Sequence, residues 1–213
     1  MPLTRLLSLV APPLCIACGS TCRVHDPLCG GCRRQLRWLG WDQPAGAGVE
    51  VWAAVSYEGP AGALVRALKF RGAVRLVDAM AAQMAANAPP RLLEGVTLVP
   101  VPLHRARRRR RGFNQAEELA RALSARSGLA VSDCLERPSA AARASQVGRA
   151  RGDRLTALAG SVRMRRGAPV PLRALLVDDV VTTGATLAAC AVALAAEGVR
   201  DVRAIAYART PGR

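Results

Sequence analysis

The chain has 213 residues, with 31 basic side chains against 15 acidic ones and a formal net charge of +16. This length is enough for one α/β domain with a small appendage and a substantial buried core. The charge favours anionic partners such as phosphorylated ligands or nucleic acid. Outside the short N-terminal apolar run, the longest uncharged apolar stretch, 187–196, is about half of what a membrane span needs, which argues against an integral membrane protein. No convincing cleavage site follows the N-terminal apolar run, so we predict a soluble cytoplasmic protein.

The first predicted elements are a short amphipathic helix in "MPLTRLLSLVAPPLC" and the cysteine-rich segment that it enters. Two C-x-x-C pairs stand with ten residues between them, and their members are Cys15, Cys18, Cys29 and Cys32. Each pair can aim two thiolates at one ion, and two pairs close a tetrahedral zinc shell with no open position for a substrate. Disulfides are disfavoured in a cytoplasmic protein, and a redox C-x-x-C leaves the second pair unexplained. The spacing therefore predicts a structural zinc ribbon.

The remaining cysteines and one histidine have other expected roles. Cys22 and His25 lie between the two pairs and could replace one of the four cysteines as a metal ligand, although residues in such positions more often do not bind the metal. Cys134 and Cys190 stand in apolar surroundings, which predicts small buried hydrophobic side chains.

From residue 48 onward, the hydrophobic pattern alternates between strands and helices. Continuous apolar runs indicate buried strands, and apolar residues at helical spacing indicate helices. The expected strands are 48–57, 95–103, 129–135, 173–180 and 199–209, and the expected helices are 61–70, 73–88, 114–127 and 185–198. Repeated strand-helix-strand order predicts an α/β fold, a parallel sheet with helices on both faces. We divide the chain into residues 1–45, the helix and zinc ribbon, and residues 46–213, the α/β domain.

Two adjacent aspartates, Asp178 and Asp179, stand at the end of a buried strand and just before a hydroxyl-rich turn, 182–186. In parallel sheets, ligands bind beyond the carboxyl ends of the strands. The turn enters a helix whose unpaired N–H groups and dipole favour an anion, and Gly184 permits close approach of a phosphate. Carboxylates beside a phosphate would repel it unless they serve sugar hydroxyls or a divalent cation. The pattern predicts a phosphorylated sugar with Mg²⁺; the alternative is an ordinary helix N-cap with acidic residues.

The segment "LLVDDVVTTGATL" resembles the phosphoribosyl-pyrophosphate (PRPP) signature of type I phosphoribosyltransferases. A four-cysteine ribbon followed by "YEGPAGALVRALKFRG", "LVPVPLHRARRRRRGFNQAEELAR" and "SQVGRARGDR" is similar to the ComF (ComFC) family of competence-associated proteins. The resemblance runs nearly end to end. It implies a type I phosphoribosyltransferase fold for residues 46–213, PRPP and Mg²⁺ as ligands, and competence or DNA-uptake machinery as a partner.

The resemblance also implies roles for individual residues. The two aspartates would hold the ribose 2′ and 3′ hydroxyls and the turn would hold the 5′-phosphate, so the PRPP-binding residues are Asp178, Asp179, Val180, Val181, Thr182, Thr183, Gly184, Ala185 and Thr186. The pyrophosphate loop would comprise Pro102, Leu103, His104 and Arg105, with the arginine as a natural donor. A mobile loop that excludes water from the reaction would contribute Gln146, Arg151 and Arg154.

Lys69 is the only lysine among the 31 basic residues. Arginine fills generic cationic positions in this chain, so the surviving lysine can mark a place where a compact ammonium matters. The alternative, that this lysine is retained by chance, is equally well supported. With Lys69 added, the expected catalytic residues are Asp178, Asp179, Lys69, Arg105 and Arg154.

Six arginines stand between positions 105 and 111. They predict a strip that binds the backbone of single-stranded DNA, with Arg107, Arg108, Arg109, Arg110 and Arg111 as candidates. The alternative is a solvated charged face. The three tryptophans, Trp38, Trp41 and Trp52, are expected to pack between ribbon and sheet, although the first two could form a basic-aromatic patch.

Two functions follow from the sequence. The first is a Mg²⁺-dependent phosphoribosyltransferase that moves ribose 5-phosphate from PRPP to an unidentified acceptor. The second is a protein that binds PRPP as a ligand or signal without turnover and handles single-stranded DNA.

Overall fold

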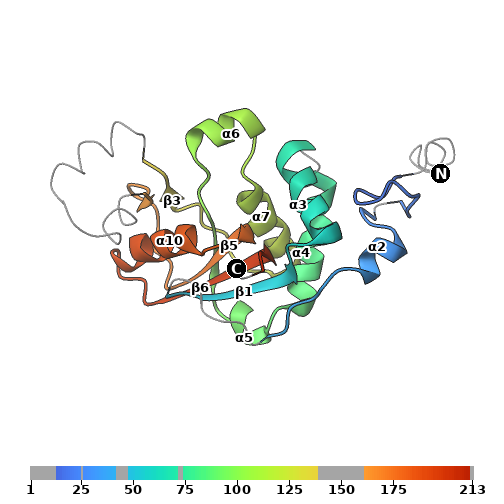
Figure 1. Cartoon of the computed structure of the whole chain (residues 1–213). Helices are drawn as coiled ribbons and strands as arrows, with labels where there is room; N and C mark the ends of the chain where they lie inside the picture. Colours follow the sequence, from blue (N-terminus) through green and yellow to red (C-terminus); the bar gives the residue numbers. More distant parts are fainter. Residues whose placement is uncertain (1–12, 25, 42–47, 72–73, 139–160, 212–213) are drawn as a thin grey trace.

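The computed structural model describes residues 13–24, 26–41, 48–71, 74–138 and 161–211 (Figure 1). Its elements in chain order are α2 (Gly30–Arg34), β1 (Glu50–Ser56), α3 (Gly59–Arg71), α4 (Val74–Asn87), α5 (Pro90–Leu93), β2 (Thr97–Pro100), α6 (Arg105–Arg111), α7 (Gln115–Ser127), β3 (Leu135–Glu136), β4 (Arg163–Met164), β5 (Arg173–Val181), α10 (Ala185–Ala195) and β6 (Asp201–Arg209).

A four-stranded parallel sheet forms the centre of the molecule. Its strand order is β1-β6-β5-β2, and every pairing in it is parallel. Because the strands run the same way, their carboxyl ends share one edge of the sheet. Pro100 at the end of β2 pairs with Val177 of β5, so Asp178 and Asp179 lie just beyond the end of β2. The predicted α/β fold is confirmed.

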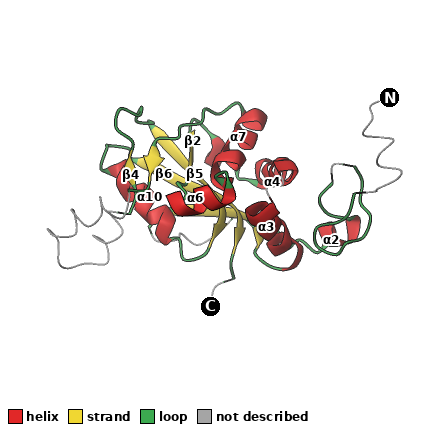
Figure 2. Ribbon diagram, turned by 90° about the horizontal axis from the view of Figure 1, so that it is seen from above, coloured by secondary structure: helices red, strands yellow, loops and turns green. Residues whose placement is uncertain are grey.

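The two faces of the sheet carry separate apolar clusters, because side chains alternate along each strand. Leu175 and Val177 of β5 join a cluster that includes residues of α3, α4 and α7. Ala174 and Leu176 join the cluster that includes the buried side of α10. Figure 2 shows the same arrangement, with α3, α4 and α7 on one side of the sheet and α10 on the other. The strands are buried on both faces, which explains their continuous apolar runs.

Two expected elements differ in the structure. The strand predicted at 129–135 is reduced to a single parallel bridge between Val131 and Leu98, and the ladder that follows is β3 paired with β4. The arginine run, for which no helix was predicted, forms α6. His104 caps its start by accepting a hydrogen bond from the Ala106 N–H, and Gly112 ends it with a left-handed φ of 80°. Arginine is a good helix former, so suitable caps at both ends suffice for one short helix.

The cysteine segment packs against the α3 side of the domain. Leu28 and Leu36 are buried in the same cluster as the helices of that face, and Trp52 of β1 is buried with them, as predicted. Trp38 and Trp41 are instead exposed, so the prediction that they pack between ribbon and sheet is wrong. The indole N–H of Trp41 donates to the Asn87 carbonyl at the end of α4, at 2.9 Å, which anchors the connecting segment from outside.

The division at residues 45 and 46 lies outside the described residues, as does the predicted N-terminal helix, and both stay predictions. Within the described part of the chain, no helix has the length and apolar character needed to cross a bilayer.

Candidate functional site

A cavity of about 590 Å³ opens where the chain leaves β2 and β5. It lies at the carboxyl edge of the sheet, where ligands of parallel sheets bind. Its lining residues are Lys69, Val101, Pro102, Leu103, His104, Arg107, Arg111, Asn114, Gln115, Ala116, Arg137, Asp178, Asp179, Val180 and Thr186. The cavity therefore joins the expected acidic pair to the loop and the arginines that follow β2.

The acidic pair forms one wall of this cavity. The Asp178 carboxylate accepts a hydrogen bond from the Asp179 N–H at 2.9 Å, and Asp179 is 7% exposed. Burial, and next the charge of Asp179, raise the pKa of Asp178 to about 8. Two carboxyl groups held this close favour ligands that supply positive charge or hydroxyl donors.

Lys69 reaches this pair from α3. Its Nζ lies 3.1 Å from Asp179 Oδ2, and both side chains are largely buried. Alternation along β5 explains the contact, because Asp179 follows Asp178 and so points to the face that α3 covers. The structure thus brings together three of the five expected catalytic residues.

The hydroxyl-rich turn lies next to the acidic pair. A smaller cavity of about 50 Å³ is lined by Asp178 and by every residue from 180 to 187. Gly184, with a left-handed φ of 75°, is the N-cap of α10 and contributes no side-chain hydrogen bond to the helix. Thr182 and Thr183 are exposed, and the Thr183 hydroxyl accepts from the Ala185 N–H at 3.4 Å. The helix start is therefore open to an anion.

The loop after β2 forms the opposite wall. Pro102, Leu103 and His104 line the cavity, as expected, whereas Arg105 is exposed on α6 and is not a lining residue. Arg107 and Arg111, one turn apart on α6, line it instead. The helix that the sequence did not predict decides which arginines face the site.

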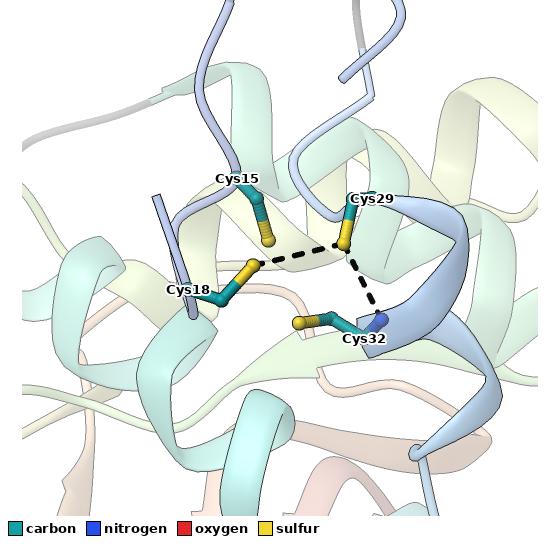
Figure 3. A group of neighbouring side chains, drawn as sticks. All are labelled: Cys15, Cys18, Cys29 and Cys32. Carbon is teal, nitrogen blue, oxygen red and sulfur yellow. Dashed lines mark hydrogen bonds between the residues drawn. The ribbon is translucent and has the colours of Figure 1, made fainter. Parts of the chain in front are cut away.

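A second site gathers the four cysteines of the two C-x-x-C pairs. Their sulfur atoms all lie within 4.8 Å of one another, and Figure 3 shows them pointing toward one centre. The Cys18 and Cys29 sulfurs are 3.7 Å apart, which matches the roughly 3.8 Å edge of a tetrahedron with Zn–S bonds of 2.3 Å. The geometry suits a structural metal ion.

The surroundings of the cluster also suit a cation. Hydrogen bonds with Ser20 lower the pKa of Cys18 to about 6, whereas burial raises the pKa of Cys32. A bound cation would offset the free-energy cost of ionising the buried Cys32 thiol. Cys22 is outside the four-residue cluster, and His25 lies outside the described residues. Cys134 and Cys190 are buried in the core, as predicted.

The chain is similar to a known protein over nearly its whole length. Competence protein F of Haemophilus influenzae is 29% identical over 205 residues, which cover 92% of this chain and 85% of that protein. The chain is a homologue of competence protein F. The ComF resemblance predicted from the motifs is thereby confirmed. No protein-family model matches the chain.

In this competence protein F homologue, Arg137 is one of several cavity residues that no sequence motif predicted. Arg137 follows β3, and its Nε donates to the Pro102 carbonyl at 2.9 Å. Its Nη2 lies 3.4 Å from the Thr186 hydroxyl. The guanidinium thus bridges the loop after β2 and the start of α10, the two segments that the resemblance assigns to the diphosphate and to the 5′-phosphate of PRPP. A lone arginine next to "PSAA" carries no signal of this role.

The residues expected in the mobile loop of this homologue, Gln146, Arg151 and Arg154, lie outside the described residues. Their roles remain predictions.

Proposed function

We propose that this competence protein F homologue binds PRPP with Mg²⁺ in the large cavity and transfers the phosphoribosyl group to an acceptor. The observation that supports the proposal is a convergence of groups at one sheet edge. The acidic pair and three arginines line the large cavity. The open helix start lines the smaller cavity, which shares Asp178, Val180 and Thr186 with the large one. These three features match the ribose hydroxyls, the 5′-phosphate and the diphosphate of PRPP.

Each wall would hold one part of the ligand. Asp178 and Asp179 would accept hydrogen bonds from the ribose hydroxyls, and the turn 182–186 would donate its N–H groups to the 5′-phosphate. Arg107 and Arg137 would face the diphosphate, whose charge suits guanidinium donors. The two carboxylates are oxygen ligands of the kind that Mg²⁺ prefers, and Mg²⁺ bound with PRPP would neutralise part of the diphosphate charge.

The reaction would break the bond between ribose C1 and the diphosphate oxygen, and the electron pair would leave with pyrophosphate. A lone pair of the acceptor would form the new bond to C1, and the acceptor would lose a proton. The protein would contribute mainly by positioning the reactants and by stabilising the charge that develops on the leaving group.

The test is to titrate the zinc-loaded protein with PRPP and Mg²⁺ by calorimetry, and then to measure pyrophosphate release with candidate acceptors. Saturable binding with release supports transfer. Binding without release for any acceptor favours a PRPP-binding protein without turnover. A folded protein that does not bind PRPP contradicts both.

Lys69→Arg is expected to weaken PRPP binding about tenfold, although the charge is preserved. The buried ion pair with Asp179 has a separation of 3.1 Å, and a guanidinium is wider and needs different hydrogen-bond geometry. Weakening this ion pair by about 1.4 kcal/mol corresponds to the expected factor. Calorimetry with PRPP measures it, with Arg66→Lys, an exposed change on the same helix, as the matched control. Unchanged affinity in Lys69→Arg would show that the ammonium is not required.

A second function is favoured by a different observation. Five of the six arginines of α6 are exposed, and among the described residues only Arg108 of these five has an acidic partner, Glu117. The name of the relative refers to competence. We propose that α6 contacts the backbone of single-stranded DNA during DNA uptake, either beside the transferase activity or in place of it.

Replacing Arg105, Arg109 and Arg110 by glutamine is expected to weaken single-stranded DNA binding and to flatten its salt dependence. For each DNA phosphate that α6 no longer neutralises, the slope of log K against log salt becomes shallower by about 0.7. These residues are exposed and do not line the cavity, so PRPP binding should be unchanged. The matched control replaces Arg34, Arg66 and Arg200, which are also exposed. Fluorescence anisotropy over a salt series gives the slopes, and equal slopes for both triple variants would contradict a specific role of α6.

A further inference from the structure

Gln115 is a buried polar residue of the cavity wall that the proposed roles leave unused. It is the first residue of α7, and it is 3% exposed although it lines the cavity. Its Oε1 accepts a hydrogen bond from Arg111 Nη1 at 3.1 Å. Its Nε2 is buried and has no hydrogen-bond partner among the residues that the structure describes. Such a donor marks a place where a partner is expected from outside the chain.

The contact with Arg111 fixes which end of the amide is available. A guanidinium only donates hydrogen bonds, so the end of the Gln115 amide that faces it must be the oxygen. The NH₂ group is therefore the end of the amide that is available to a ligand. Leaving a buried donor without a partner is unfavourable, and a ligand oxygen at this point would remove that cost.

The neighbouring groups on this wall supply donors and positive charge. Asn114 has both ends of its amide in use, because Nδ2 donates to the Val101 carbonyl and Oδ1 accepts from the Ala116 N–H. The carboxylate of Glu117 is paired with Arg108 and Arg121. The charged side chains of α6 that line the cavity are Arg107 and Arg111. The wall therefore suits an oxyanion, and it does not suit a cation or a ligand group that donates hydrogen bonds.

We propose that Gln115 Nε2 donates a hydrogen bond to a diphosphate oxygen of the bound ligand, and that Arg111 holds the amide in the orientation that this requires. This inference rests on the proposed function, because it assigns the α6–α7 wall to the diphosphate end of PRPP. The turn 182–186, beyond the acidic pair, is left for the 5′-phosphate. Gln115 is thus a binding residue for the diphosphate end of the ligand, and it makes no contact with the single phosphate at the 5′ end of the sugar.

The test compares three probes, PRPP, inorganic pyrophosphate and ribose 5-phosphate, each titrated with Mg²⁺ into the full zinc-loaded chain. The variants are Gln115→Leu, which removes the donor, and Gln115→Glu, which keeps an oxygen for Arg111 but replaces the donor with a negative charge. Gln35→Glu makes the same charge change at an exposed position of the cysteine segment and is the control. Thermal midpoints without ligand show whether each variant is folded.

Both Gln115 variants are expected to bind PRPP and pyrophosphate roughly ten- to a hundredfold more weakly, the range for removing a hydrogen bond to a charged group. Their affinity for ribose 5-phosphate should match that of the wild type and of Gln35→Glu. Equal affinities for pyrophosphate in the wild type and in a folded Gln115 variant would overturn the inference, as would an equal loss for all three probes. If the wild type binds none of the probes, the proposed function fails and the inference fails with it.

Discussion

The double replacement Asp178→Asn with Asp179→Asn is expected to abolish measurable PRPP binding, with a loss of at least about a hundredfold. The two carboxylates form one wall of the cavity, and an amide offers one weaker acceptor where a carboxylate offers two charged oxygens. Replacement also removes the negative charge that Mg²⁺ would need nearby. Calorimetric titration with PRPP and Mg²⁺ measures the change. The matched control, Asp78→Asn with Asp133→Asn, removes two exposed carboxylates elsewhere and should bind PRPP like the wild type.

Thermal unfolding of the single variant Asp178→Asn separates a binding role of Asp178 from a structural one. Because the folded protein raises the pKa of Asp178 from 3.8 to about 8, folding favours the protonated form. The stability that this form supplies is complete below about pH 4 and is lost as the pH rises through about 8. The single variant Asp178→Asn should therefore unfold a few degrees above the wild type at pH 8 and above. A lower midpoint would mean that Asp178 supports the fold, and retained PRPP affinity in the double variant would contradict the proposed site.

Replacing both Cys15 and Cys32 by serine is expected to remove bound zinc and to lower the thermal unfolding midpoint by at least about 5 °C. Both cysteines are buried in the apolar cluster that also contains residues of α3, so loss of the metal would disturb the packing between the cysteine segment and that helix. Structural zinc sites supply folding free energy directly, and serine hydroxyls are poor zinc ligands. The zinc content of the purified protein, about one ion per chain in the wild type, and a thermal scan give the two readouts.

Cys22→Ser is the matched control for the zinc experiment, because Cys22 belongs to the same segment but not to the four-residue cluster. It should keep its zinc and the wild-type midpoint. Loss of zinc in Cys22→Ser would make Cys22 a ligand. A double variant of Cys15 and Cys32 that retains zinc would contradict a four-cysteine site.

Local signals predicted much of the fold and part of the site. The start and end of α7 could be predicted because Asn114 and Gly128 act through the backbone next to them, as N-cap and left-handed C-cap. The two C-x-x-C pairs predicted one cluster because each pair is a single local turn. The position of the acidic pair at the sheet edge followed from the end of an apolar run, and β5 ends two residues after Asp179.

What the sequence by itself determined about this protein is therefore what neighbouring residues impose on one another: the order of strands and helices, the metal-ligand spacing, and the acidic pair followed by an open helix start. Only the tertiary structure decided which distant side chains share the cavity. Lys69 meets Asp179 across 110 positions, Arg137 bridges Pro102 and Thr186, and one turn of α6 brings Arg107 and Arg111 to the site in place of Arg105. The physical reason is that these interactions depend on which face of an element each side chain occupies and on how the elements pack, and neither is encoded within a local stretch of chain.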